Sequence, residues 1–234
     1  MWEWVASAGA VVASAGGVTA YGTVATSAQL FGPSVYRGPG KRHTIALTFD
    51  DGPSPGTPLL LEYLERQGIR ATFFECGRNV ERYPEISRAV AAAGHELGNH
   101  TDSHPRLYLR SPQFIDQQFT RAQRIIADVT GVRPRLLRAP YGLRWYGIGK
   151  TQRKLGLMGV MWTVIGHDWE WGAEQVAQLV LRKASPGGIV CLHDGRGIQP
   201  KPDVRAMMGA MERIVPVLKD QGYGFETVSE LLVD

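Results

Sequence analysis

The sequence predicts one α/β domain built on a parallel sheet, either open or closed into a barrel, and three observations support this. The chain has 234 residues, which fits a single domain of this class. Short apolar runs alternate about seven times with segments of helical periodicity, as is typical of strand–helix units. Polar residues cluster directly after the apolar runs, where the carboxyl ends of parallel strands carry the chemistry of such folds.

The first half of the predicted sheet consists of three strands, each followed by a helix. Gly68 ends the first helix, because glycine favours the left-handed conformation after a last turn. Pro84 lies in the first turn of the second helix, and Gly94 lies beyond its end. Ser111 is suited to cap the third helix, with Pro112 after it. We therefore expect strands at residues 44–49, 71–76 and 95–98, and helices at residues 59–67, 84–93 and 111–130.

The second half continues the alternation with shorter elements. Pro216 falls within the last long helical segment, and we expect it to interrupt or bend that helix. The pattern predicts strands at residues 135–137, 159–164, 189–192 and 223–226, helices at residues 145–155, 173–184 and 203–221, and a closing segment at residues 228–232.

The N-terminal segment differs in composition from the rest of the chain. No charged residue occurs from Trp4 to Tyr36, a length sufficient to cross a bilayer, although Ala, Gly and Ser make the segment weakly apolar. A membrane anchor, an export signal and a soluble extension all fit this composition. We therefore divide the chain into an apolar segment at residues 1–36, a linker at residues 37–43 and a catalytic domain at residues 44–234.

The charge and the cysteines exclude other classes of function. The formal net charge of +4 is mild, and the basic residues are scattered instead of forming a stripe, so we expect no nucleic-acid partner. Cys76 and Cys191 each lie in an apolar run, where a free buried thiol is the expected state and a disulfide is the alternative.

Two motifs together indicate a metal centre. Asp50 and Asp51 follow the first strand, directly before a Gly-Pro turn. His100 and His104 are spaced to face one side of a helical turn, and two imidazoles with a carboxylate suit zinc or a similar divalent ion. Taken singly, the acidic pair could cap a helix and the histidines could be surface residues. Both motifs follow predicted strands, which favours the metal site.

Five motifs in order resemble the polysaccharide deacetylase family, the carbohydrate esterase group that shares the NodB homology domain. They are TFDDGP at residues 48–53, GHELGNHTDSH at 94–104, RAPYG at 138–142, HDW at 167–169 and LHDG at 192–195. The similarity extends from about residue 41 to residue 232. It implies a distorted (β/α)7 barrel of parallel strands, with these motifs at the carboxyl ends of the strands.

The resemblance also implies a role for each matched residue. Asp50 would be the general base, held by Arg138, and Asp51 would bind a divalent metal with His100 and His104. This ion would be zinc, or cobalt or another divalent ion. His193 would be the general acid, oriented by Asp168. Substrate contacts would come from the Tyr141 backbone N–H and from the side chains of Trp169 and Leu192.

The implied reaction is metal-dependent hydrolysis of the N-acetyl amide of an amino-sugar glycan, such as a chitooligosaccharide or peptidoglycan, in the cell envelope by an anchored or secreted enzyme. Many relatives carry an aspartate three residues before Asp168, where this chain has Ile165. Two alternatives stay open: a deformylase or deacetylase of a lipid-linked sugar or a non-sugar amide, and a carbohydrate-binding protein without catalysis.

Overall fold

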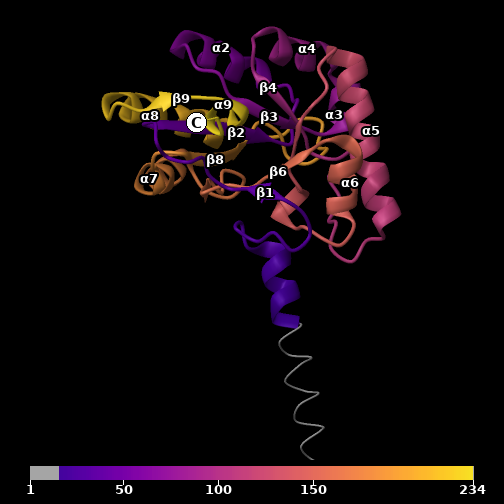
Figure 1. The fold of residues 1–234 in the computed structure, drawn as a ribbon. Coiled ribbons are helices and arrows are strands. Elements are labelled where there is room, and N and C mark those ends of the chain that lie inside the picture. The colour runs from indigo at the N-terminus through magenta and orange to yellow at the C-terminus, as the bar shows by residue number, and fades with distance from the viewer. Residues whose placement is uncertain (1–15, 234) are drawn as a thin grey trace, which may run out of the picture.

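A computed structural model describes residues 16–233 and shows a curled sheet of nine strands surrounded by helices (Figure 1). The strand order is β1-β6-β5-β4-β3-β2-β8-β7, with β9 beside β2, and every strand pair is parallel. This confirms the predicted α/β barrel-like class. The strands are β1 (Ser34–Val35), β2 (Thr44–Asp50), β3 (Thr72–Glu75), β4 (Glu96–Asn99), β5 (Leu136–Leu137), β6 (Met158–Val160), β7 (Val164–Ile165), β8 (Gly188–His193) and β9 (Gly224–Phe225).

The helices lie around the sheet, and a further helix at residues 16–24 projects from the end of the domain (Figure 1). Ser111 caps the long helix α5 as predicted, because its hydroxyl accepts the Phe114 N–H. The helical elements are α2 (Thr57–Gln67), α3 (Gly77–Arg82), α4 (Pro84–Ala92), α5 (Pro112–Thr130), η1 (Pro140–Gly142), α6 (Ile148–Leu155), α7 (Ala173–Lys183), α8 (Arg205–Asp220) and α9 (Val228–Leu231).

Strand β2 pairs with β3, β8 and β9, and it ends at Asp50, the first residue of the acidic pair. Successive side chains of a strand point to opposite faces. Ile45, Leu47 and Phe49 therefore pack into the large core cluster beneath the helices. Thr48 and Asp50 point to the other face, inside the curl of the sheet. Asp50 is in register with His193 of β8, so two of the predicted catalytic residues lie side by side.

The predicted strand at residues 159–164 is two strands. Strand β6 pairs with β5 and β1, whereas β7 pairs with β8. Between them, the Met161 N–H binds the Val35 carbonyl, while the Thr163 N–H binds the Ile189 carbonyl. The chain thus changes neighbours within three residues, which an apolar run cannot reveal.

Two helical predictions also differ from the structure. Helix α8 continues through Pro216, so the interruption is wrong, while the alternative, a bend at this residue, stays a prediction. Helix α3 was not predicted. It is only one and a half turns long and starts directly after β3, at a cysteine whose side chain makes no cap hydrogen bond.

The folded domain begins earlier than the predicted boundary. Strand β1 belongs to the sheet through its pairing with β6, and Arg37 forms an antiparallel bridge with Gly188 at the start of β8. Residues 34–37 therefore span the gap between β6 and β8 and help to close the curl. The predicted apolar segment also includes residues 1–15, which lie outside the described residues. Among residues 16–233, no helix is both long enough and apolar enough to cross a membrane.

Candidate active site

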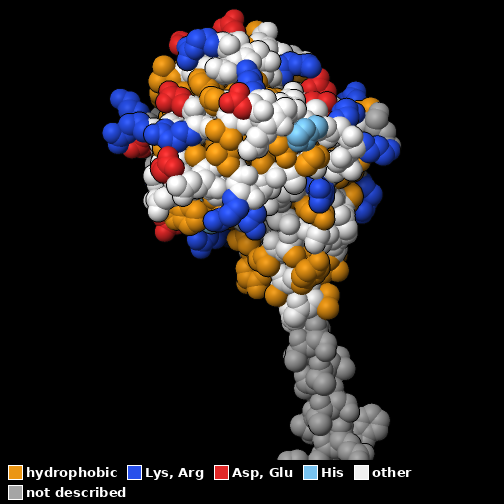
Figure 2. Space-filling view, turned by 90° about the vertical axis from the view of Figure 1, so that its left-hand side faces the viewer, with side chains coloured by type: hydrophobic (Ala, Val, Ile, Leu, Met, Phe, Trp, Pro, Cys, Tyr) orange, Lys and Arg blue, Asp and Glu red, His pale blue; other side chains and the backbone are white. Residues whose placement is uncertain are grey.

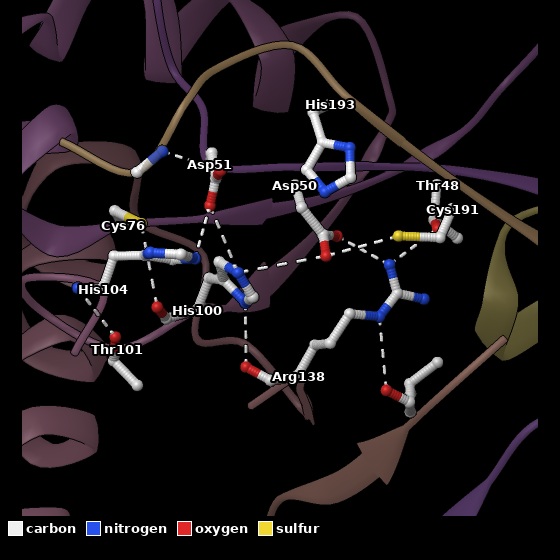
Figure 3. Close-up of polar contacts among 12 residues, drawn as sticks. Thr48, Asp50, Asp51, Cys76, His100, Thr101, His104, Arg138, Cys191 and His193 are labelled. Atoms are coloured by element: carbon white, nitrogen blue, oxygen red, sulfur yellow. Dashed lines mark hydrogen bonds and ion pairs between the residues drawn. The ribbon is translucent and has the colours of Figure 1, made fainter. Parts of the chain in front are cut away.

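The Asp50 carboxylate lies between His100, His193 and Arg138 (Figure 3). Its side chain is almost fully buried. Oδ1 accepts a hydrogen bond from Nη1 of Arg138 at 2.6 Å, and the Cys191 thiol donates to Oδ2 at 3.5 Å. One oxygen is therefore committed to the guanidinium, while the other faces the histidines.

Arg138 is fixed in position by the barrel interior. It is fully buried and donates to the Thr48 hydroxyl at 2.8 Å, in addition to Asp50. Its remaining donors reach the carbonyls of Val160 and Met161, both at 3.2 Å. Because each of the three guanidinium nitrogens has a hydrogen-bond acceptor, Arg138 holds the carboxylate in one orientation.

Asp51 points away from Asp50 and toward the two histidines of the second motif. Its backbone has a φ of 71°, in the left-handed region. Oδ1 lies 2.9 Å from Nε2 of His104 and 3.3 Å from Nε2 of His100, and Oδ2 accepts the Gly197 N–H at 2.7 Å. Burial acts to raise the pKa of Asp51, but the hydrogen bonds and charges of the two histidines hold it well below its usual value.

The donors of this cluster fit a divalent cation. Nδ1 of His100 lies 2.8 Å from the carbonyl of Arg138, and since a carbonyl only accepts, this nitrogen carries the ring proton. The other ring nitrogen, Nε2, faces Oδ1 of Asp51 at 3.3 Å. The ligand atoms of Asp51, His100 and His104 lie within 4.8 Å of one another, and Oδ1 of Asp51 is buried between the two rings. Imidazole nitrogens and a carboxylate oxygen that converge in this way suit a bound divalent cation.

The two histidines meet across a loop, and the predicted helical turn is wrong. Residues 100–104 follow β4 without helical structure, and Thr101 and His104 have left-handed φ values of 69° and 53°. Asp102 ties this loop to its surroundings, since it is buried and forms ion pairs with Arg121 at 3.2 Å and Arg78 at 3.7 Å.

His193 and Asp168 form a second pair on the opposite side of Asp50 from the two histidines of the second motif. Nδ1 of His193 lies 2.9 Å from Oδ1 of Asp168, and the His193 N–H donates to Oδ2 at 2.9 Å. Burial acts to lower the pKa of His193, but the charge and hydrogen bond of Asp168, with the charges of Asp51 and Asp50, raise it to about 9. The imidazole is therefore held in its charged form at neutral pH.

These groups line one cavity of about 520 Å³. Tyr141, with a left-handed φ of 60°, and Trp169 lie on its rim and are partly exposed. Leu192, predicted to wall the pocket, is instead fully buried in the large core cluster. The described lining consists of Asp50, Asp51, His100, His104, Tyr141, Gly142, Trp162, Ile165, Trp169, His193, Gly195, Arg196, Gly197 and Gln199.

The sequence prediction missed several residues that shape the site. Asn79 donates to the carbonyls of Asp51 and Gly197, both at 2.7 Å. It therefore joins the loop that follows β2 to the loop that follows β8. Trp162 and Ile165 provide the apolar wall that was assigned to Leu192. None of these residues lies at a matched motif position. Cys191 directly precedes a motif, but an apolar run gave no signal that its thiol reaches a carboxylate.

The family model and the two relatives described here are all deacetylases. A family model described as polysaccharide deacetylase matches residues 37–160. The chain is 37% identical over 196 residues to a chitooligosaccharide deacetylase of Azorhizobium caulinodans, covering 78% of this chain and 91% of that protein. It is 32% identical over 198 residues to a peptidoglycan-N-acetylglucosamine deacetylase of Bacillus cereus, covering 84% and 70%.

Solved structures agree with these relatives. A peptidoglycan N-acetylglucosamine deacetylase bound to an N-hydroxybenzamide compound superposes with a TM-score of 0.79 at 32% identity, covering 84% of this chain and 91% of that one. A pseudoenzyme of the same carbohydrate esterase family from Bacillus anthracis superposes with a TM-score of 0.78 at 28% identity, covering 86% and 69%. The chain therefore belongs to the polysaccharide deacetylase family of hydrolases.

Proposed function

We propose that this protein hydrolyses the N-acetyl amide of an amino sugar within a glycan and releases acetate. The observation that carries the proposal is the arrangement around Asp50, which has a three-donor cation site on one side and a charged histidine on the other. Amide hydrolysis requires an electrophile activator, a base and an acid around one carbonyl, and this cavity presents a candidate for each.

Asp51, His100 and His104 are the residues that would hold the ion, and imidazole with carboxylate favours zinc, with cobalt as the alternative. A bound divalent ion would supply a Lewis acid that polarises the amide carbonyl and lowers the pKa of an attacking water.

Asp50 is the proposed base. Oδ1 is occupied by Arg138 at 2.6 Å, so Oδ2 is the oxygen that takes the proton from the attacking water. The guanidinium holds the carboxylate through this hydrogen bond, and its other acceptors, Thr48, Val160 and Met161, fix the orientation of the guanidinium itself.

His193 is the proposed acid. Asp168 occupies Nδ1, which leaves Nε2 to deliver its proton to the nitrogen of the departing amine. A pKa of about 9 makes the protonated ring available at neutral pH.

The remaining groups would position the substrate. The backbone N–H of Tyr141 is the proposed donor to the oxyanion, and one such donor contributes about 3–4 kcal/mol to transition-state stabilisation. Trp169, whose ring meets His193 edge-on at 5.0 Å between centroids, would cover the acetyl methyl group together with Trp162 and Ile165.

The test is acetate release from an N-acetylated chitooligosaccharide and a peptidoglycan fragment, assayed side by side with added zinc or cobalt and again after chelation. Acetate that disappears on chelation and returns with metal would support the proposal. Bound metal without acetate from either glycan would favour a formylated, lipid-linked or non-sugar amide. Neither acetate nor bound metal would indicate a non-catalytic protein, as in the Bacillus anthracis relative.

A further inference from the structure

Apolar side chains gather at the end of the domain from which the helix at residues 16–24 projects. Figure 2 shows them where the molecule narrows, next to that helix. We call this surface the foot and define it by five exposed apolar or aromatic residues and two cations. The apolar members are each more than half exposed to solvent: Val18, Tyr21, Val24, Leu30 and Tyr146.

Two cations complete the foot. Lys150 and Arg153 lie three residues apart on α6, so they project from one face of the helix. They line a groove of about 750 Å³ together with Leu30, Phe31 and Tyr146, and no carboxylate lines that groove in the described chain. Within residues 16–233, neither cation has a hydrogen-bond or ion-pair partner, whereas the adjacent Lys154 pairs with Asp116 at 2.6 Å.

The foot is held rigidly against the catalytic domain. Arg144 is buried beneath it and donates to the carbonyls of Ala25 and Ala28, the latter at 2.6 Å, and to the Ser34 hydroxyl at 3.0 Å. The rings of Phe31 and Trp145 pack with their centroids 5.3 Å apart. The exposed side chains therefore belong to a fixed surface of the domain.

The chemistry of the foot suits a lipid surface. Tyrosines beside aliphatic side chains are typical of the membrane–water interface, and lysine and arginine without acidic partners attract anionic headgroups. The sequence supports this occupant independently, because no charge occurs from residue 4 to residue 36, a stretch that contains the N-terminal part of the foot. We propose that the foot rests on the surface of a membrane that carries anionic lipids. This proposal is independent of the proposed deacetylation.

A site-specific fluorescence probe tests the contact in the full chain. Cys76 and Cys191 are fully buried, so a cysteine introduced at the surface can be labelled selectively with an environment-sensitive dye. The probes are Val24→Cys and Tyr146→Cys in the foot, and the control is Val217→Cys on α8, which is also exposed. Vesicles consist of phosphatidylcholine alone or of equal parts phosphatidylcholine and phosphatidylglycerol.

We expect the emission of both foot probes to shift to the blue with the phosphatidylglycerol vesicles and the control to stay unchanged. The double variant Lys150→Gln/Arg153→Gln should bind these vesicles about tenfold more weakly. The matched variant Arg182→Gln/Lys183→Gln, on exposed positions at the end of α7, should bind like the original chain. Neither variant should alter metal-dependent acetate release from a soluble glycan.

Three results would overturn the proposal. The first is vesicle binding without a shift of the Tyr146→Cys probe, since that would place the contact elsewhere on the chain. The second is equal binding of the Lys150→Gln/Arg153→Gln variant. The third is a blue shift that depends on protein concentration in the absence of vesicles, which would identify the foot as an interface between copies.

Discussion

Neighbouring aspartates face different partners in this site because the backbone turns between them. Asp50 ends β2 in extended conformation and points into the curl toward Arg138, whereas the left-handed φ of Asp51 turns its side chain toward His100 and His104. Two carboxylates in adjacent positions repel each other, and here each has its own cationic or donor partners. Each aspartate can therefore be tested separately.

Replacing the base should separate catalysis from metal binding. We expect Asp50→Asn to lower the acetate release rate by about a thousandfold, because the amide cannot take the proton from the water. Metal content should stay near that of the original chain, since the ligands are unchanged; it can be measured by elemental analysis after dialysis. Asp51→Asn is the matched control and should lose metal as well as activity. An active Asp50→Asn variant would contradict the assignment of the base.

His95 should make the fold sensitive to mild acid. It is buried, and its Nδ1 accepts the Ala71 N–H at 3.1 Å. Burial, aided by the charge of Arg70, lowers its pKa to about 4 from an ordinary value near 6.5. Between these pH values the unfolded chain binds a proton that the folded protein does not, so stability falls as the pH drops through this window.

The expected contribution of His95 is a loss of about 2 kcal/mol of unfolding free energy between pH 7 and pH 5. The amide of a His95→Gln variant can accept the same N–H without titrating, so urea unfolding should show a smaller loss over that interval. Identical pH dependence in both proteins would refute this prediction.

The sequence motifs predicted which side chains of the site pair with each other better than they predicted where each side chain points. Asp50 pairs with Arg138 and Asp168 pairs with His193, which are the two pairings that the motif resemblance implied. The burial of the Leu192 side chain in the core could not be predicted, since an apolar side chain at a strand end points either into the cavity or into the core according to the local twist of the strand. Gly197 contributes only backbone groups, its N–H to Asp51 and its carbonyl to Asn79, which no side-chain pattern can indicate.

At the scale of elements, the loop between β4 and α5 brings His100 and His104 together beside Asp51. Three of its residues, Thr101, His104 and Leu109, are left-handed, a conformation that non-glycine residues keep only when surrounding contacts impose it. The Gly77 and Arg78 N–H groups bind the carbonyls of Thr101 and Asp102, at 3.0 and 2.9 Å. The buried Asp102 side chain adds its ion pairs with Arg121 and Arg78.

Asp102→Asn should therefore weaken metal binding without touching a ligand. The variant keeps the size of the side chain but loses the charge that holds both arginines, and supporting residues of this kind typically change metal affinity about tenfold. Competition with a fluorescent chelator measures the dissociation constant. Glu85→Gln, at an exposed position of α4, is the control and should bind the metal with unchanged affinity. Unchanged affinity in Asp102→Asn would show that the backbone contacts suffice.

The elements themselves could be predicted wherever a local signal existed. Ser111 and Pro112 marked the start of α5, and Gly68 marked the end of α2, because caps and left-handed glycines act locally. The division of residues 158–165 into β6 and β7 depends on β1 and β8, which are distant in sequence. Long-range pairing of this kind leaves no trace in the run itself.

At the scale of the whole molecule, the part before the predicted catalytic domain contributes to its stability. A chain that begins at residue 16 keeps every contact of the described residues and serves as the reference form. A chain that begins at residue 37 loses β1 and the carbonyl partners of buried Arg144, and should be less stable by at least about 3 kcal/mol. Denaturant unfolding of both forms measures the difference, and equal stability would show that β1 is dispensable.

Strand β1 also has a consequence for the order in which the chain can fold during synthesis. Its partner β6 and the start of β8 emerge from the ribosome long after it, so the first strand stays unpaired until Met158–Val160 and then Gly188 have been made. Domains generally fold as units during translation, and unpaired strand edges make incomplete chains prone to aggregation. The nascent protein therefore exposes the unpaired backbone of β1 until more than half of the chain has been made.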